Sequence, residues 1–292
     1  MRLLELTATD GLCLSTFDGD EIPPYAILSH TWQQDEEEVT FQDLISNRGK
    51  DRAGYRKIQI CRKKALEDGI SYIWVDTCCI DKSSSSELSE AINSMFRWYQ
   101  NATRCYAYLS DVVVNEADLS EDRSQSTWDS SFRNCRWFTR GWTLQELLAP
   151  KSVYFFSRDG ELLGDKKSLE TQVHDITGIP ITALRGADLS TFSVEERLRW
   201  QERRQTKRSE DRAYSLLGLF GVFMPIIYGE GEQNAFRRLR DEITKIMGRR
   251  FFNIPFRRDA GFVGREDLLA QIEQILDRRG TTVALCGLGG VG

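Results

Sequence analysis

The sequence predicts an α/β fold with a central parallel sheet and flanking helices, a β-hairpin at the N-terminus and a helical extension at the C-terminus. Two observations lead to this prediction. Short apolar runs that suit buried strands alternate with segments of helical periodicity, and polar residues follow the runs. The resulting order of strand, helix, strand, helix, strand, helix, strand is typical of a sheet built with right-handed crossovers.

The predicted sheet begins with a hairpin, formed by residues 2–7 and 12–17 around Asp10-Gly11 and added at one edge. Runs rich in aromatic and β-branched residues follow. Each is bounded by polar residues, as expected for a buried strand: 25–28, 72–75, 105–109 and 153–156.

Helices are predicted between these strands. Residues 55–70 carry apolar side chains at helical spacing and close near Gly69: Ile58, Cys61, Ala65 and Leu66. Residues 87–102 do the same after a run of serines: Leu88, Ala91, Ile92, Met95 and Tyr99. Residues 157–245 are expected to form further helices around the sheet.

The segment RGWTLQELLAP, residues 140–150, places an acid among leucines. In a helix ended by Pro150 the leucines form one stripe that packs on a core. Glu146 and Trp142 lie one turn apart on another face, which we expect to point away from the core. Glu146 is either an ordinary solvated side chain or, if a cleft covers this face, a functional carboxylate.

A cleft is plausible here because ligands of open parallel sheets bind beyond the carboxyl ends of the strands. The polar residues at these positions are candidate substrate-binding groups: Ser29, His30, Trp32, Asp76 and Asp81. The alternatives are structural. Asp76 or Asp81 could cap the following turn, and His30 could be a half-buried histidine with a satisfied hydrogen bond.

Composition limits the class of protein. The 292 residues are 40% hydrophobic and 28% charged, with a net charge of -5, which suits one large or two smaller globular domains. We expect a cytoplasmic protein without a membrane span, since neither a long apolar run nor a signal peptide is present. Seven cysteines without a CxxC pair, and two histidines, argue against a disulfide framework and a metal site.

The acidic balance also argues against nucleic-acid binding, although residues 203–212, RRQTKRSEDR, form a local basic cluster. We interpret this cluster as a solvated helix face first. A site for an anion or a protein partner is the alternative.

Four stretches carry a specific resemblance. YAILSHTW, YIWVDTCCID and WFTRGWTLQELLAP resemble, in order and spacing, the signature blocks of the fungal heterokaryon-incompatibility (HET) domain. The later stretch RSEDRAYSLLGLFGVFMPIIYGEGEQNAFRRL resembles its C-terminal block. The resemblance covers residues 1–245 and implies the cell-death effector domain of a fungal NLR-like receptor, acting in heterokaryon incompatibility or innate immunity.

A more distant resemblance concerns chemistry. The order of GISYIWVD, the segment 87–111 and RGWTLQELL is similar to TIR domains, whose W-x-L-x-E-L pattern fits Trp142, Leu144, Glu146 and Leu147. It implies a flavodoxin-like strand order and Glu146 as the catalytic carboxylate of NAD+ cleavage, with Trp142 beside the substrate. A carboxylate suits this reaction because loss of nicotinamide leaves an oxocarbenium-like ribose. NAD+ would then be a substrate, and no cofactor is expected.

The end of the chain resembles another family. FVGREDLLAQIEQIL and TTVALCGLGGVG, within residues 262–292, resemble the start of a STAND nucleotide-binding domain of the NB-ARC or NACHT type, after a linker at 246–261. Four glycines fit the first part of a P-loop: Gly287, Gly289, Gly290 and Gly292. The lysine and hydroxyl of that motif are absent, so ATP and magnesium are expected only in the full-length receptor. Its STAND and sensor domains, and other copies of the chain after activation, are the expected partners.

Three functions therefore remain open. The first is an NAD+-consuming enzyme, and the second is a non-catalytic module that signals death by self-association. The third, a hydrolase using Cys78 or Cys79 with His30, is the least favoured, because adjacent cysteines at a strand end are more often packing thiols.

Overall fold

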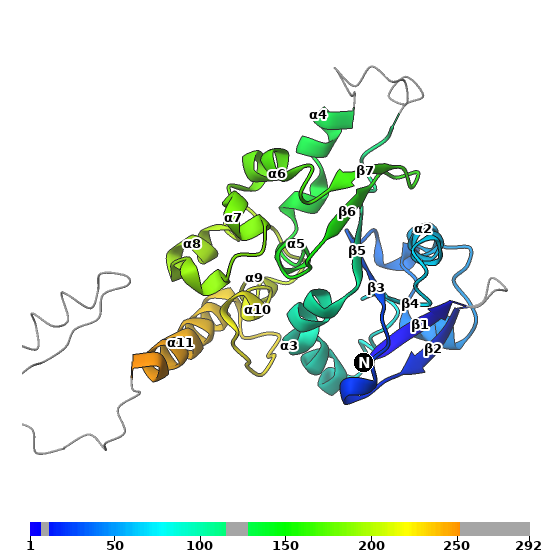
Figure 1. Ribbon diagram of the computed structural model, residues 1–292. Helices are drawn as coiled ribbons and strands as arrows, with labels where there is room; N and C mark the ends of the chain where they lie inside the picture. The colour runs from blue at the N-terminus through cyan, green and yellow to red at the C-terminus, as the bar shows by residue number, and fades with distance from the viewer. Residues whose placement is uncertain (7–11, 115–127, 252–292) are drawn as a thin grey trace, which may run out of the picture. The chain divides into compact units, whose positions relative to one another are not determined.

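The sheet contains all the strands of the computed structural model, which describes residues 1–6, 12–114 and 128–251 (Figure 1). In chain order the strands are β1 (Arg2–Leu6), β2 (Leu12–Thr16), β3 (Ala26–His30), β4 (Tyr72–Trp74), β5 (Arg104–Tyr108), β6 (Val153–Phe156) and β7 (Leu162–Asp165). Their order across the seven-stranded sheet is β2-β1-β4-β3-β5-β6-β7. The sheet belongs to a compact unit that extends from Met1 to Gly248.

The centre of the sheet is parallel, as predicted. β3 pairs with β4 on one side and with β5 on the other, and β5 pairs with β6, all in parallel. Among these strands the first in the chain therefore lies inside the sheet, which is the flavodoxin-like order. The chain changes direction across the sheet between β3 and β5, and folds of this kind bind ligands beyond that point.

Antiparallel strands close both edges. The N-terminal hairpin pairs β1 with β2 and joins the sheet through β4, which confirms the predicted edge hairpin. β7 pairs with β6 at the other edge, within a segment where only helices were expected. It is a short edge strand with an exposed Leu162 and a glycine at position 164, so it lacks the buried apolar run that marks the parallel strands.

Helices on both faces cover the parallel strands (Figure 1). α2 (Tyr55–Glu67) connects β3 to β4, and α3 (Ser85–Asn101) connects β4 to β5, with the Ser84 hydroxyl accepting from the Glu87 amide at its start. The apolar stripe predicted for α3 is buried apart from a partly exposed Leu88. In α2 only Leu66 departs from the prediction, since it is exposed.

Shorter helices complete the connections. They are α1 (Phe41–Ile45), α4 (Trp128–Arg133), the 3-10 helix η5 (Arg136–Thr139) and α5 (Thr143–Leu148), which lies on the same face as α3. Further 3-10 turns lie at η1 (Gly19–Glu21), η2 (Asp35–Glu37) and η6 (Leu189–Thr191). Leu144, Leu147 and Leu148 of α5 are buried in the core, as their spacing predicts.

A helical extension follows β7, as predicted. It consists of α6 (Glu170–Thr177), α7 (Ile181–Leu184), α8 (Val194–Arg199), α9 (Asp211–Tyr214), α10 (Leu217–Phe220) and α11 (Glu232–Phe251). α10 packs directly on α3, and a side chain at Gly218 would meet Phe96 at 2.1 Å. The extension is thereby brought against the helix that follows β4, close to the C-terminal edge of the sheet.

A second unit comprises residues 249–292. Nearly all of it lies outside the described residues, including the predicted P-loop glycines Gly287, Gly289, Gly290 and Gly292. Within the described ranges no helix combines the length and apolar character needed to cross a membrane.

Candidate functional site

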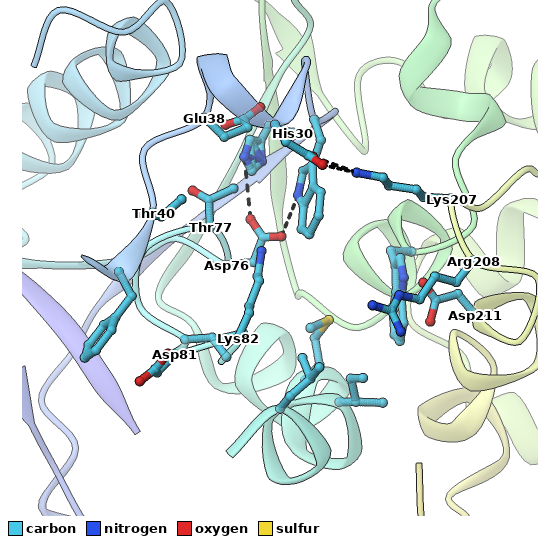
Figure 2. A pocket seen from close by; sticks show the side chains of 18 of the residues that line it. His30, Glu38, Thr40, Asp76, Thr77, Asp81, Lys82, Lys207, Arg208 and Asp211 are labelled. Atoms are coloured by element: carbon cyan, nitrogen blue, oxygen red, sulfur yellow. Dashed lines mark hydrogen bonds and ion pairs between the residues drawn. The ribbon is translucent and has the colours of Figure 1, made fainter. Parts of the chain in front are cut away.

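A pocket of about 500 Å³ lies beyond the carboxyl ends of β3 and β4 (Figure 2). Its walls come from the segments that follow these two strands, from α3, from the start of α5 and from residues 207–228. Six of the seven predicted catalytic and substrate-binding residues line it: His30, Trp32, Asp76, Asp81, Trp142 and Glu146. The sequence thus located the pocket, although residues from the C-terminal extension complete its wall.

Glu146 is buried, and the prediction that it points outward was wrong in this respect. Only 7% of the residue is exposed, and every residue of the six-residue helix α5 is buried. The periodicity identified the leucine stripe correctly, but it could not show that the opposite face of α5 is covered as well. Trp142, the residue before α5, is half-buried and shares the pocket with Glu146, as predicted.

A chain of hydrogen bonds holds the carboxylate. The hydroxyl of Ser29 donates to Glu146 Oε2, and the indole nitrogen of Trp137 donates to Ser29 Oγ at 2.8 Å. Ser29 is fully buried in β3 and does not line the pocket. It was predicted to contact substrate, whereas its side chain instead contacts Glu146.

The surroundings of Glu146 favour its neutral form. Burial, together with the negative charge of Asp76, raises the pKa of Glu146 to about 8. The hydrogen bond from Ser29 and the charge of Arg204 act in the opposite direction. Glu146 is therefore mostly protonated near neutral pH in the empty pocket, and a positively charged ligand would favour its ionised form.

Two buried cations fix the ends of α5. Arg204 donates from Nη1 to the hydroxyl of Thr143 at 2.8 Å, at the N-terminal end. Lys166 donates from Nζ to the carbonyl oxygens of Leu147 at 3.1 Å and Pro150 at 2.7 Å, at the C-terminal end. A helix of six residues has little stability of its own. These contacts therefore help to hold Glu146 in place.

The opposite wall is organised around Asp76. Trp32 donates from Nε1 to Asp76 Oδ2 at 2.7 Å, and His30 Nε2 lies 3.5 Å from Asp76 Oδ1. Burial, followed by the charges of Lys57 and Lys82, lowers the pKa of His30 well below its usual value, so the imidazole is neutral at physiological pH. Asp76 is thus an oriented carboxylate facing a neutral histidine.

Comparison with known proteins identifies the N-terminal part of the chain. Residues 25–126 match the family described as Heterokaryon incompatibility protein (HET). The chain contains a HET domain. It is also 57% identical over 225 residues to the vegetative incompatibility protein HET-E-1 of Podospora anserina, an alignment that covers 77% of this chain and 16% of that protein. No solved structure matches the chain.

The pocket of the HET-containing chain also includes residues that the sequence analysis did not select. Three of them, Lys82, Arg140 and Tyr228, lie outside the basic cluster at 203–212, and three more, Lys207, Arg208 and Asp211, lie within it. That cluster is the signal that could have found them. It is not one solvated helix face, since Arg204 is buried and the positions 203–210 are outside any helix.

Asp81 caps a turn, which is the structural alternative to substrate binding that the sequence offers for this residue. Its carboxylate accepts from the Ser83 backbone amide at 3.0 Å and from the Ser83 hydroxyl at 2.6 Å, and these bonds lower its pKa. It stabilises the turn that leads toward α3. It also lines the pocket, at one end of the wall shown in Figure 2.

The cysteines do not form a catalytic pair with His30. Cys78 and Cys79 are buried, and the Cys79 sulfur accepts from the Val75 amide at 3.3 Å. Hydrogen bonding with Cys79 and burial raise the pKa of Cys78 well above its usual value, which suppresses the thiolate. Because the described contacts include none between either sulfur and His30, the geometry does not favour a cysteine hydrolase.

Proposed function

We propose that this chain is the effector part of a fungal incompatibility receptor and that it kills the cell by cleaving NAD+ in the cytoplasm. The observation that carries the catalytic part is the buried carboxylate of Glu146 in a pocket at the C-terminal edge of a parallel sheet. The identity with HET-E-1 supports the biological role. The chain spans only 16% of that relative. We therefore also propose, as part of the same function, that nucleotide-binding and sensor domains of a larger receptor are the partners of this chain.

The proposed chemistry uses Glu146 in its ionised form. The bond between ribose and nicotinamide breaks, and its electron pair leaves with the ring nitrogen of nicotinamide. The carboxylate stabilises the positive charge that develops on the ribose, then accepts a proton from the attacking water. NAD+ and water thus give ADP-ribose, nicotinamide and a proton. The positive charge of the bound nicotinamide lowers the pKa of Glu146 and ionises it when substrate is present.

The other groups of the pocket fit this substrate. Its volume of about 500 Å³ is in the range of small-molecule sites. Asp76 lines the pocket, and its buried Oδ1 accepts no hydrogen bond from the described residues, so this carboxylate keeps an unused acceptor beside His30. Trp142 offers an aromatic face beside Glu146.

We further propose that self-association switches the effector on, with the receptor part driving clustering. The isolated chain is then nearly inactive, and fusion to an oligomerising domain restores activity. Equal NAD+ loss with a proven monomer and a tethered oligomer would contradict this part of the proposal.

Expression of the oligomerising fusion in a fungal host tests the catalytic proposal. The parent chain is expected to lower cellular NAD+ and viability, and Glu146→Gln to do neither while remaining folded. Glu90→Gln, the same change at an exposed position of α3, is the matched control and retains both effects. Death without NAD+ loss, or an unchanged lethality of Glu146→Gln, would instead favour the non-catalytic signalling module.

A further inference from the structure

Three cations of the pocket form no ion pair with the described residues. Lys82, Arg140 and Arg208 line it, and in the described part of the chain none of their side chains forms an ion pair or donates a hydrogen bond. Lys207 at the same pocket differs, because its ammonium group donates to Asp35 at 2.6 Å.

Lys82 lies on an aromatic face and forms no ion pair, although the negative charge of Asp76 attracts it. Its Nζ lies 3.6 Å from the centroid of the Trp32 ring, a cation–π contact. The same indole donates its N–H to Asp76. The edge of the ring therefore binds the carboxylate of Asp76, while its face contacts the ammonium group of Lys82. Lys82 is exposed by surface area, yet protein atoms crowd its ammonium group and lower its pKa.

Arg208 lies on another wall of the pocket (Figure 2), and it repeats this arrangement with Tyr228. Its Cζ lies 3.9 Å from the centroid of the Tyr228 ring, and the Tyr228 hydroxyl donates to Asp211 Oδ1 at 3.0 Å. In both places the N–H or O–H group of an aromatic side chain donates to a carboxylate, and the cation lies on the face of that ring. The donors of Lys82 and Arg208 therefore remain available to a ligand.

Arg140 adds a third positive charge between α5 and η5. Burial and the neighbouring Arg136 lower the pKa of Arg140, while the charges of Asp211 and Glu146 act in the opposite direction. Glu146 in the same pocket is mostly protonated near neutral pH and compensates little of the charge of Arg140. An anion bound among the three cations would offset the desolvation of Lys82 and Arg140.

We propose that Lys82, Arg140 and Arg208 form a subsite for the phosphate groups of a dinucleotide, so that the pocket selects nucleotides with a diphosphate over nucleosides. Two guanidinium groups and one ammonium group suit the charge and the several acceptor oxygens of a diphosphate. Apolar side chains of α3, Ile92 and Met95, line the same pocket and provide a surface for a base. This inference rests on the proposed function, since it concerns the substrate of the same pocket.

Calorimetric titration of the chain with ADP-ribose, adenosine and inorganic pyrophosphate tests the subsite. ADP-ribose is expected to bind about tenfold or more tightly than adenosine, with an advantage that shrinks as salt is added. Pyrophosphate is expected to compete with ADP-ribose. Lys82→Gln and Arg208→Gln are each expected to weaken ADP-ribose binding by about tenfold while leaving adenosine binding within about threefold.

Lys207→Gln is the matched control, because it removes the same charge from a side chain that Asp35 already engages. It is expected to change ADP-ribose affinity by less than about threefold. Thermal unfolding checks that every variant is folded, and Lys82→Arg and Arg208→Lys, which keep the charge, must retain most of the binding. Equal affinity for ADP-ribose and adenosine, or equal losses in Lys82→Gln and Lys207→Gln, would overturn the subsite.

The subsite and the catalytic proposal fail in different ways. ADP-ribose binding that depends on Lys82 and Arg208, in a chain that leaves NAD+ intact even when oligomerised, would support the subsite and remove the catalysis. NAD+ cleavage that is unchanged in both Lys82→Gln and Arg208→Gln would overturn the subsite and leave the catalysis standing.

Discussion

Replacing Glu146 with Gln should change how the stability of the protein depends on pH. The pKa of Glu146 is raised from 4.5 to about 8 in the folded state. Its contribution to stability is therefore fully present below the unfolded value and is lost as the pH rises through about 8. Each pKa unit corresponds to about 1.4 kcal/mol, and allowing for partial titration the folded protein loses about 2 kcal/mol between pH 6 and pH 8 from this group.

Gln has nearly the same shape, accepts the hydrogen bond from Ser29 and does not titrate, so Glu146→Gln removes this loss. Urea unfolding of parent and variant, followed by tryptophan fluorescence, measures it. The stability of the variant relative to the parent is expected to increase by about 2 kcal/mol between pH 6 and pH 8. Glu90→Gln, on the exposed face of α3, should instead follow the parent throughout.

A difference between parent and Glu146→Gln that stays constant within about 0.5 kcal/mol over this range would refute the reasoning. It would mean that Glu146 is as ionised in the folded chain as in the unfolded one. A variant that does not fold at any of these pH values would also refute it, because a neutral isostere should suit a site that already favours the neutral acid.

Three further changes test buried polar contacts around the pocket. Ser29→Ala removes a hydrogen bond that lowers the pKa of Glu146, so the pH profile of NAD+ loss should move to higher pH, with KM nearly unchanged; an unmoved profile would contradict this. Arg204→Met should lower the free energy of unfolding, measured by urea titration, by about 2–4 kcal/mol, because the first turn of α5 loses buried donors. A loss below about 0.5 kcal/mol would be inconsistent with that role. Lys57→Met should lower the free energy of unfolding by about 3–5 kcal/mol in the same assay, because the buried Glu38 Oε1 loses Lys57 Nζ, its partner at 2.6 Å. Adding Glu38→Gln should recover part of this loss, whereas additive losses would argue against coupling between the two side chains.

The parallel sheet could be predicted because its strands are local patterns. Runs such as residues 153–156 are apolar on both faces, and the helices between them repeat apolar residues at helical spacing, so neither prediction needs knowledge of distant contacts. The strand β7 has no such pattern. Its place at an edge is decided by pairing with β6, which the local sequence does not encode.

In the candidate site, too, only the residues with a local sequence pattern could be predicted. Glu146, Asp76 and His30 could be selected because each stands at a recognisable position relative to a strand or a helix stripe. The wall formed by Arg208 and Tyr228 depends on how the extension folds back on the domain, which periodicity does not reveal. The burial of Glu146 escaped prediction for the same reason, since the cover over the second face of α5 is set by tertiary packing.

Some of the contacts that hold α5 can form only late in translation. Ser29 precedes Glu146 by 117 positions, while the two buried cations at the helix ends, Lys166 and Arg204, follow it in the chain. A ribosome that has just released Glu146 has therefore not yet synthesised either cation, nor Tyr228 in the pocket wall. Unfinished chains lack parts of the pocket, so whatever the pocket does is withheld until translation has passed the C-terminal extension.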